Sequence, residues 1–293
     1  MPNNAQARFA LVALFAGAAG IGFAPIFVRL SPVGPSATAF YRLALAIPAL
    51  WIWMKCEASS DAPPARPTTR GHFGALALAG FFFAGDLAFW HWSLRLTSVV
   101  DATLLANCAP IVVTIGAHFL FGEKITPRFI SGMIIAMLGA ALVVGASFHQ
   151  SPARLLGNVF GLITPVFYGA YMLSLKSLRG TFSTATIMSW SGLFACPILF
   201  VVALMSGESF LVPTLSGWGV LVALGLISHA GGQSLIAFAF AHLPASFSSV
   251  GLLLQPVIAA FLAWIILSES LTWLQATGGI VVLAGIALAK RSR

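Results

Sequence analysis

One stretch of this chain occurs twice, and the duplication constrains the fold more than any other feature. The stretch that begins at Pro110 aligns without a gap with the stretch that begins at Pro256, at a constant offset of 146 residues. The same offset superimposes three further pairs: Glu123 with Glu269, Gly132 with Gly278 and Gly139 with Gly285. Apolar runs flank the glutamate in both copies. These pairs predict an internal duplication, and a duplicated pair of apolar helices is typical of secondary transporters built from inverted repeats.

The apolar runs are long, and the chain carries too little charge for a soluble domain. Hydrophobic residues make up 59% of the sequence and charged residues 8%, whereas soluble domains carry about 25% charged residues. A membrane-spanning helix needs about 20 apolar residues, so 293 residues with short loops allow about ten such helices. The runs are continuous and do not show the alternation of β-barrel strands. We therefore predict an all-α polytopic membrane protein with ten transmembrane helices.

The predicted helices divide into two sets of five within one transmembrane domain. The first set occupies residues 9–145, with helices at 9–28, 36–54, 72–92, 99–121 and 126–145. The second set occupies residues 155–289, with helices at 155–175, 184–205, 216–241, 245–267 and 271–289. The apolar run after Arg8 is longer than the core of a signal peptide, so we interpret it as the first helix.

Basic residues predict the orientation of both sets. If the N-terminus is cytoplasmic, the inner loops and tails hold eleven Lys and Arg residues and the outer loops hold three, as the positive-inside rule requires. Both termini are then cytoplasmic. Because five is an odd number, the second set enters the membrane upside down, and accordingly Arg29 falls outside whereas its counterpart Lys176 falls inside. Two inverted repeats predict a bundle around a central cavity near the membrane midplane.

Two stretches, Leu96–Thr126 and Leu243–Thr272, carry a loop, small residues, a proline and a terminal glutamate in the same order. In this order they resemble the drug/metabolite transporter superfamily, specifically its ten-helix EamA branch, although the second copy departs from the first at Ser268 and Ser270. The resemblance covers essentially the whole chain and implies an exporter of small metabolites in the bacterial inner membrane. It also implies that the fifth and tenth helices lie outside the cavity. Within this branch the chain looks most like bacterial aromatic amino-acid exporters.

Two charged residues lie inside predicted helices. An ionised side chain costs a few kcal/mol at the centre of a bilayer unless it has a partner or water. Arg42 and Asp86 are predicted at similar depths in neighbouring helices, so we expect them to lie close enough to interact. They could form a structural pair between the helices. Alternatively, one of them could bind a zwitterionic substrate or form part of an outer gate.

Several uncharged polar and aromatic residues are further candidates for the cavity. His229 and Gln233 are four residues apart and share a helix face, where they could line the cavity or form an interhelical hydrogen bond. Tyr168 and Tyr171 also share a face and could stack on a substrate or pack in the core. Trp90 is interpreted as an anchor at the membrane interface. The predicted substrate cavity comprises Asp86, His229, Gln233, Tyr168, Tyr171, Phe83, Asn107 and Ser249.

The duplicated prolines and glutamates suggest mechanical roles. A proline inside a helix frees a carbonyl group and bends the helix, so Pro110 and Pro256 are predicted hinges. Glu123 and Glu269 follow two predicted helices at opposite membrane faces. We expect each to end one helix and start the next, and a role in coupling transport to an ion is the alternative.

The sequence favours a secondary transporter over a membrane-embedded enzyme or a channel. No metalloprotease motif, paired aspartates or phosphate-binding glycine loop is present, so we expect neither enzymatic activity nor use of ATP. A channel is less favoured because channels usually need symmetric assembly around a filter. Few membrane charges and many aromatic residues favour small neutral or zwitterionic substrates, with amino acids, including aromatic ones, as the first choice. Amphipathic drugs or cations are the alternative.

Other partners are not expected. Cys56, Cys108 and Cys196 lie far apart without metal-ligand spacing, so we expect neither a disulfide nor a metal site. The net charge of +8 is spread over many loops, which argues against nucleic-acid binding. We expect no cofactor, and the partners should be a small-molecule substrate and membrane lipids. A monomer is plausible.

Overall fold

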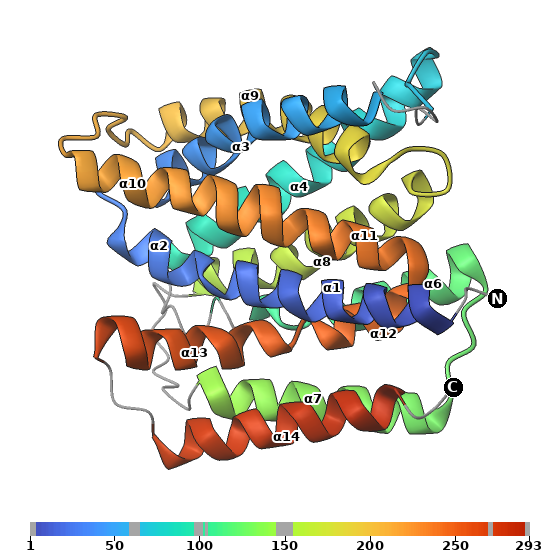
Figure 1. Cartoon of the computed structure of the whole chain (residues 1–293). Coiled ribbons are helices and arrows are strands. Elements are labelled where there is room, and N and C mark those ends of the chain that lie inside the picture. Colours follow the sequence, from blue (N-terminus) through green and yellow to red (C-terminus); the bar gives the residue numbers. More distant parts are fainter. Residues whose placement is uncertain are drawn as a thin grey trace.

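A computed structural model describes residues 4–58, 65–96, 102, 105–144, 155–268 and 272–290 of the chain, and every regular element in these ranges is a helix (Figure 1). Eight spans among them are long and apolar enough to cross a membrane, and two shorter apolar helices, Ala109–Phe121 and Pro127–Val143, complete the set. The predicted all-α, ten-helix membrane fold is therefore confirmed. The elements are α1 (Asn4–Gly22), α2 (Ala24–Leu30), α3 (Pro35–Ala58), α4 (Arg70–Leu96), α6 (Ala109–Phe121), α7 (Pro127–Val144), α8 (Leu155–Leu178), α9 (Thr184–Met205), α10 (Leu215–Ala223), the π-helical segment η2 (Leu224–Gln233), α11 (Ser234–His242), α12 (Ala245–Gly251), α13 (Leu254–Leu267) and α14 (Trp273–Lys290).

Large apolar side chains cover the outside of the bundle, and small ones fill the helix contacts. On α6, for example, Phe119 is 79% exposed and Leu120 is 66% exposed, whereas Val113 and Ala117 are fully buried. Lipid tails are as apolar as these outward side chains, so close packing of small residues is what holds membrane helices together.

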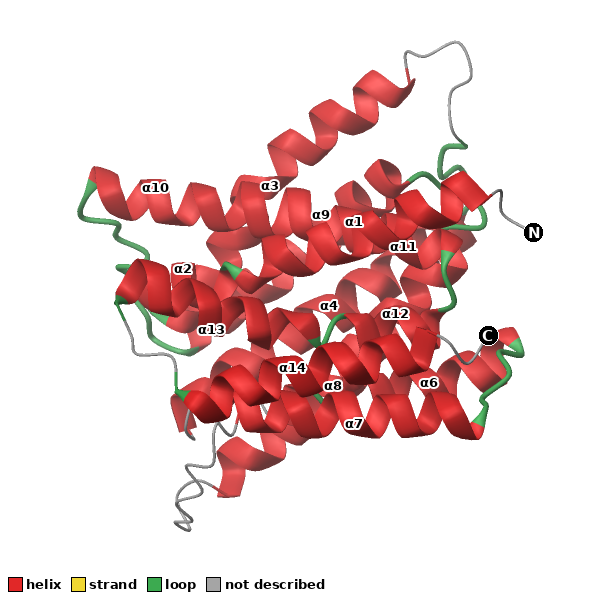
Figure 2. Ribbon diagram, turned by 60° about the horizontal axis from the view of Figure 1, so that its bottom comes forward, coloured by secondary structure: helices red, strands yellow, loops and turns green. Residues whose placement is uncertain are grey.

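Helices α7 and α14 illustrate this packing and lie side by side at one edge of the bundle (Figures 1 and 2). A β-carbon added to Gly132 would lie 2.8 Å from the carbonyl oxygen of Gly285, and one added to Gly139 would lie 2.8 Å from that of Gly278. The two helices therefore run antiparallel, with their backbones in direct contact at both glycine pairs. Only glycine permits this approach.

Four helices that surround the core are interrupted. The predicted helix 9–28 divides at Phe23, just before Pro25, and the predicted helix 245–267 divides at Leu252 and Leu253, just before Pro256. A turn at Asn107 and Cys108 precedes α6 and Pro110 in the same way. The predicted helix 216–241 is instead divided by the π-helical segment η2, which packs against α1. The sequence predicted bends at Pro110 and Pro256, but it predicted neither the break at Phe23 nor the π-helical segment, because hydropathy does not register such local changes.

Both copies of the duplicated stretch end their first helix in the same backbone conformation. Gly122 ends α6 with a φ of 63°, and Ser268, which lies 146 residues later, has a φ of 55°. Glycine adopts this left-handed region freely, whereas serine does so at a cost. The predicted counterpart of Glu123, Glu269, lies outside the described residues.

The start of α1 and the end of α14 lie on the same side of the bundle, which we call the terminal side (Figure 1). The connection between α6 and α7 lies on this side as well. The connection between α9 and α10 lies on the other side, which we call the opposite side.

Candidate functional site

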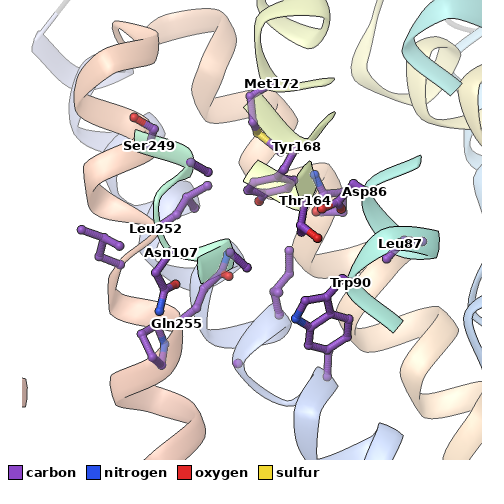
Figure 3. Close-up of a pocket in the computed structure, with 18 of the residues that line it drawn as sticks. Asp86, Leu87, Trp90, Asn107, Thr164, Tyr168, Met172, Ser249, Leu252 and Gln255 are labelled. Atoms are coloured by element: carbon purple, nitrogen blue, oxygen red, sulfur yellow. The ribbon is translucent and has the colours of Figure 1, made fainter. Parts of the chain in front are cut away.

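A cavity of about 160 Å³ lies where the interrupted helices meet (Figure 3). Its walls include Gly22 and Pro25 from the break between α1 and α2, and Leu252 and Leu253 from the break between α12 and α13. Broken helices expose backbone groups that an intact helix would satisfy internally, and transporters place such breaks at their binding sites. The polar and aromatic lining comprises Arg42, Phe83, Asp86, Trp90, Asn107, Thr164, Tyr168, Gln233, Ser249 and Gln255.

The cavity lining includes one buried basic side chain and one buried acidic side chain. Arg42, on α3, is 5% exposed, and Asp86, on α4, is 8% exposed. The two side chains interact electrostatically, but no hydrogen bond or ion pair between them is found in the described part of the chain, and the Nε atom of Arg42 has no hydrogen-bond partner there. Both charges therefore face the cavity without neutralising each other by direct contact.

Three amide side chains add unpaired donors to this site. Within the described residues, the side-chain nitrogens of Asn107, Gln233 and Gln255 are buried without a hydrogen-bond partner. Figure 3 shows Asn107 and Gln255 on one side of the cavity, with Asp86 and Tyr168 on the other. Buried polar groups in proteins are nearly always hydrogen-bonded to protein or water, so these donors are suited to bind a polar ligand or water.

Aromatic rings form the next layer. Phe83 stacks on Tyr171, with ring centroids 4.5 Å apart, and on His229, with centroids 5.3 Å apart. Phe83 lines the cavity, whereas Tyr171 and His229 lie beside it and do not line it. The Tyr171 hydroxyl donates to the sulfur of Met188 at 3.6 Å. These two residues support the cavity wall, because their rings are turned into the packing between helices.

Two other predicted lining residues reach the cavity in different ways. The Tyr168 hydroxyl approaches the Gln255 amide, so it is placed to share a ligand with that group. Ser249 lines the cavity, but its hydroxyl already donates to the carbonyl oxygen of Ser246 at 2.8 Å. Ser249 is therefore the less available donor of the two.

The predicted cavity set lacks three polar or aromatic residues that line the cavity, namely Trp90, Thr164 and Gln255. Trp90 was expected at the membrane interface, yet it lines the cavity, and its position four residues after Asp86 on one helix face could have revealed this. Thr164 lies on α8 one turn before Tyr168 and donates to the carbonyl oxygen of Phe160 at 3.0 Å. Among the described residues, no group of three His, Cys, Asp or Glu side chains is placed to hold a metal ion.

Comparison with protein families shows the class to which this protein belongs. The model of the EamA-like transporter family matches the chain twice, over residues 8–145 and over residues 155–291. The chain belongs to the EamA-like transporter family. It is therefore a multi-pass membrane transporter with a small-molecule substrate and lipid surroundings, and it is not an enzyme.

Two similar proteins are exporters. The pseudopaline exporter of Pseudomonas aeruginosa is 28% identical over 225 residues, which cover 76% of this chain and 74% of that protein. A probable terminal-alkyne amino-acid exporter of Streptantibioticus cattleyicolor is 29% identical over 195 residues, covering 65% of this chain and 63% of that protein. A solved crystal structure superimposes with a TM-score of 0.80 over 99% of this chain and 98% of that one, and its 16% sequence identity makes it evidence for the fold alone.

On the terminal side, this EamA-family transporter carries a second polar cluster, which we call the Glu123 latch. The Glu123 carboxylate accepts hydrogen bonds from the backbone N–H of Ala245 at 2.6 Å, the backbone N–H of Ser246 at 3.1 Å and the Ser246 hydroxyl at 2.5 Å. Lys176 lies 3.9 Å from the same carboxylate and donates to the carbonyl oxygen of Leu243 at 2.8 Å. Glu123 thus caps the first turn of α12, in the other half of the chain. It was expected to start the next helix, α7, but there Thr126 accepts from the backbone N–H of Phe129 instead.

Proposed function

We propose that this protein is a secondary transporter in the bacterial inner membrane that exports small zwitterionic metabolites, with amino acids, including aromatic ones, as the first candidates. The observation that carries the proposal is the cavity at the helix breaks, which holds Arg42 and Asp86 without a direct contact between them. A charged residue inside a membrane protein is functional by default, because its burial is costly.

An inverted duplication is part of the proposal. The contacts between α7 and α14 support it, because Gly132 meets Gly285 while their repeat partners, Gly278 and Gly139, meet each other. Such reciprocal contacts are what a two-fold axis between equivalent helices produces. The double match of one family model over residues 8–145 and 155–291 also supports two repeats.

We further propose that transport proceeds by alternating access. The cavity lies at the start of α6, whereas the Glu123 latch joins the two halves at the far end of that helix, so the terminal side is held together by polar contacts. The breaks before Pro110 and Pro256 are the candidate hinges. With both termini in the cytoplasm, as the distribution of basic residues predicts, the latch would be the cytoplasmic gate.

The chemistry of the lining favours a zwitterion over the alternatives. Asp86 would attract an amphipathic cation, but Arg42 in the same cavity would repel it. A site for phosphorylated metabolites would call for several cationic residues, whereas Arg42 is the one Lys or Arg among the described residues of the lining. The similarity to a probable terminal-alkyne amino-acid exporter also supports substrates that carry amino and carboxyl groups.

Transport by the purified protein in liposomes is the decisive test. We expect saturable counterflow of labelled leucine or phenylalanine without ATP, with cationic dyes and sugar phosphates as the comparison substrates. Flux that does not saturate would indicate a channel, and counterflow of the dyes alone would replace amino acids by amphipathic cations. Maleimide labelling of single cysteines at positions 2 and 292 in sealed cells tests the orientation, since cytoplasmic termini should resist an impermeant reagent.

A further inference from the structure

We propose that the cavity recognises the two charges of one substrate separately, with the carboxylate on Arg42 and the ammonium group on Asp86. The proposal rests on the proposed function and deepens it, because it names the groups that a substrate must carry. The substrate class is then the free α-amino acid with an apolar side chain, and amines or acids with only one of the two charges are poor ligands.

The first argument is the state of the two charges without substrate. Arg42 and Asp86 come from the neighbouring helices α3 and α4 and face one cavity, yet no ion pair joins them in the part of the chain that the structure describes. A structural pair would be expected in direct contact, because contact best offsets the cost of burying both charges. Separation leaves each charge available to a ligand of opposite sign.

The second argument is charge balance. The pair sums to zero, so a bound zwitterion compensates both charges and leaves the cavity neutral. A bound amine would compensate Asp86 and leave the Arg42 guanidinium unpaired, and a bound carboxylic acid would leave Asp86 unpaired. An unpaired buried charge is strongly unfavourable, so the site selects for ligands with both groups.

The third argument is the distribution of the remaining polar and apolar groups. The unpaired amide nitrogens of Asn107, Gln233 and Gln255 are hydrogen-bond donors, which suit the oxygens of a carboxylate. Ile21, Leu252 and Leu253 form an apolar part of the cavity wall. An apolar side chain can lie against this wall.

The unaltered protein allows a test that needs no variant. Three ligands of the same carbon skeleton are compared: leucine, 3-methylbutylamine and 4-methylpentanoate. Binding is measured by titration calorimetry or by thermal stabilisation of the purified protein, and transport by inhibition of labelled leucine counterflow. We expect leucine to bind at least about tenfold more tightly than either analogue, which is the effect of losing one charged hydrogen-bond partner. Equal binding of the amine or the acid would overturn the proposal.

Two variants assign the charges to the residues. Arg42→Gln should reverse the preference so that the amine binds more tightly than leucine, and Asp86→Asn should do the same for the acid. One control should keep the wild-type preference. Arg128→Gln removes an exposed charge on α7 outside the cavity.

The outcomes separate this proposal from the proposed function. Leucine counterflow without discrimination between the three ligands would refute the charge assignment and leave the exporter intact. Selective leucine binding without flux would support the assignment and refute transport. An absence of leucine binding would overturn both. If a cavity variant does not fold, the comparison of the three ligands on the unaltered protein still tests whether the site requires both charges.

Discussion

Replacing Glu123 with alanine is predicted to open the terminal side of the transporter. The carboxylate is 12% exposed and accepts three hydrogen bonds from the first turn of α12, two of them from backbone N–H groups that have no helical acceptor. Loss of a helix cap costs about 0.5–2 kcal/mol, and a hydrogen bond to a charged group contributes about 1.5–3 kcal/mol. Because water can replace some of these bonds at the end of the bundle, we expect the closed state to lose about 2–4 kcal/mol. That loss shifts the equilibrium between closed and open states by roughly 30- to 900-fold.

Two measurements follow the opening. Hydrogen exchange should accelerate in the peptide that contains Ala245 and Ser246, since both amides lose their acceptor. A cysteine at Ser249, in a chain whose native cysteines have been replaced, should become reactive toward an impermeant maleimide added from the terminal side. Glu123→Gln should give an intermediate result, because its amide oxygen still accepts but carries no charge.

The matched control is Glu208→Gln. Glu208 accepts from the backbone N–H of Ala37 at 2.9 Å and so contacts the first turn of α3 on the opposite side. The Glu208 carboxylate therefore also caps a helix, but at the other end of the bundle, so its replacement should leave hydrogen exchange in α12 unchanged. If Glu123→Ala alters neither the exchange of α12 nor the labelling at Ser249, the latch does not hold the terminal side closed.

Four further changes test other parts of the structure. Gly285→Leu should lower the free energy of unfolding by about 3 kcal/mol or more, because the leucine side chain would meet the α7 backbone at Gly132 and Ala136. This loss should appear as a lower melting temperature in detergent, whereas Gly219→Leu, at a position with no neighbour within 4 Å, should leave the melting temperature unchanged. Ser268→Gly should raise the free energy of unfolding by about 1 kcal/mol in a thermal or denaturant melt, because glycine relieves the left-handed backbone, and Ser216→Gly at an ordinary helix start should not. Pro256→Ala should slow leucine counterflow while leaving leucine binding unchanged if the break before α13 is a hinge, and loss of binding would contradict this. Asn107→Leu should raise the melting temperature by removing an unpaired buried amide and should weaken leucine binding, and a fall in both would indicate a structural role instead.

The membrane-spanning helices could be predicted from the sequence because they depend on local properties. The cost of placing a residue in lipid is nearly additive along a helix, so runs of apolar residues identify the spans. Bends were predicted at Pro110 and Pro256, and turns lie just before both prolines. The break at Phe23 was not predicted, since Phe23 carries no signal of its own and the backbone there is set by Pro25 and by packing. The sequence predicted that Gly132 allows close helix packing, but it could not predict that the partner is Gly285, because the local sequence does not indicate which helix packs against it.

The cavity was predictable in part for a related physical reason. Burial of Arg42 and Asp86 in membrane helices is so costly that their presence alone marks a site, and the structure places both in the cavity lining. Tyr171 and His229 carry no such cost, and their position depends on which way each helix face turns. The unusual winding of η2 around His229 cannot be read from hydropathy, since a π-helix differs from an α-helix only in its hydrogen-bond register.

Because the chain has few acidic residues, the position of each one in the structure is informative about function. The sequence holds seven Asp and Glu residues, and three of those described in the structure occupy positions that bear on transport. Asp86 lies in the cavity, whereas Glu123 and Glu208 cap helices at opposite ends of the bundle. Each of these two caps joins one half of the chain to the other, since Glu123 contacts α12 and Glu208 contacts α3. The proposed rocking motion of the halves would therefore change the surroundings of both carboxylates, and a substrate bound at Asp86, as proposed, would be in a position to favour one arrangement over the other.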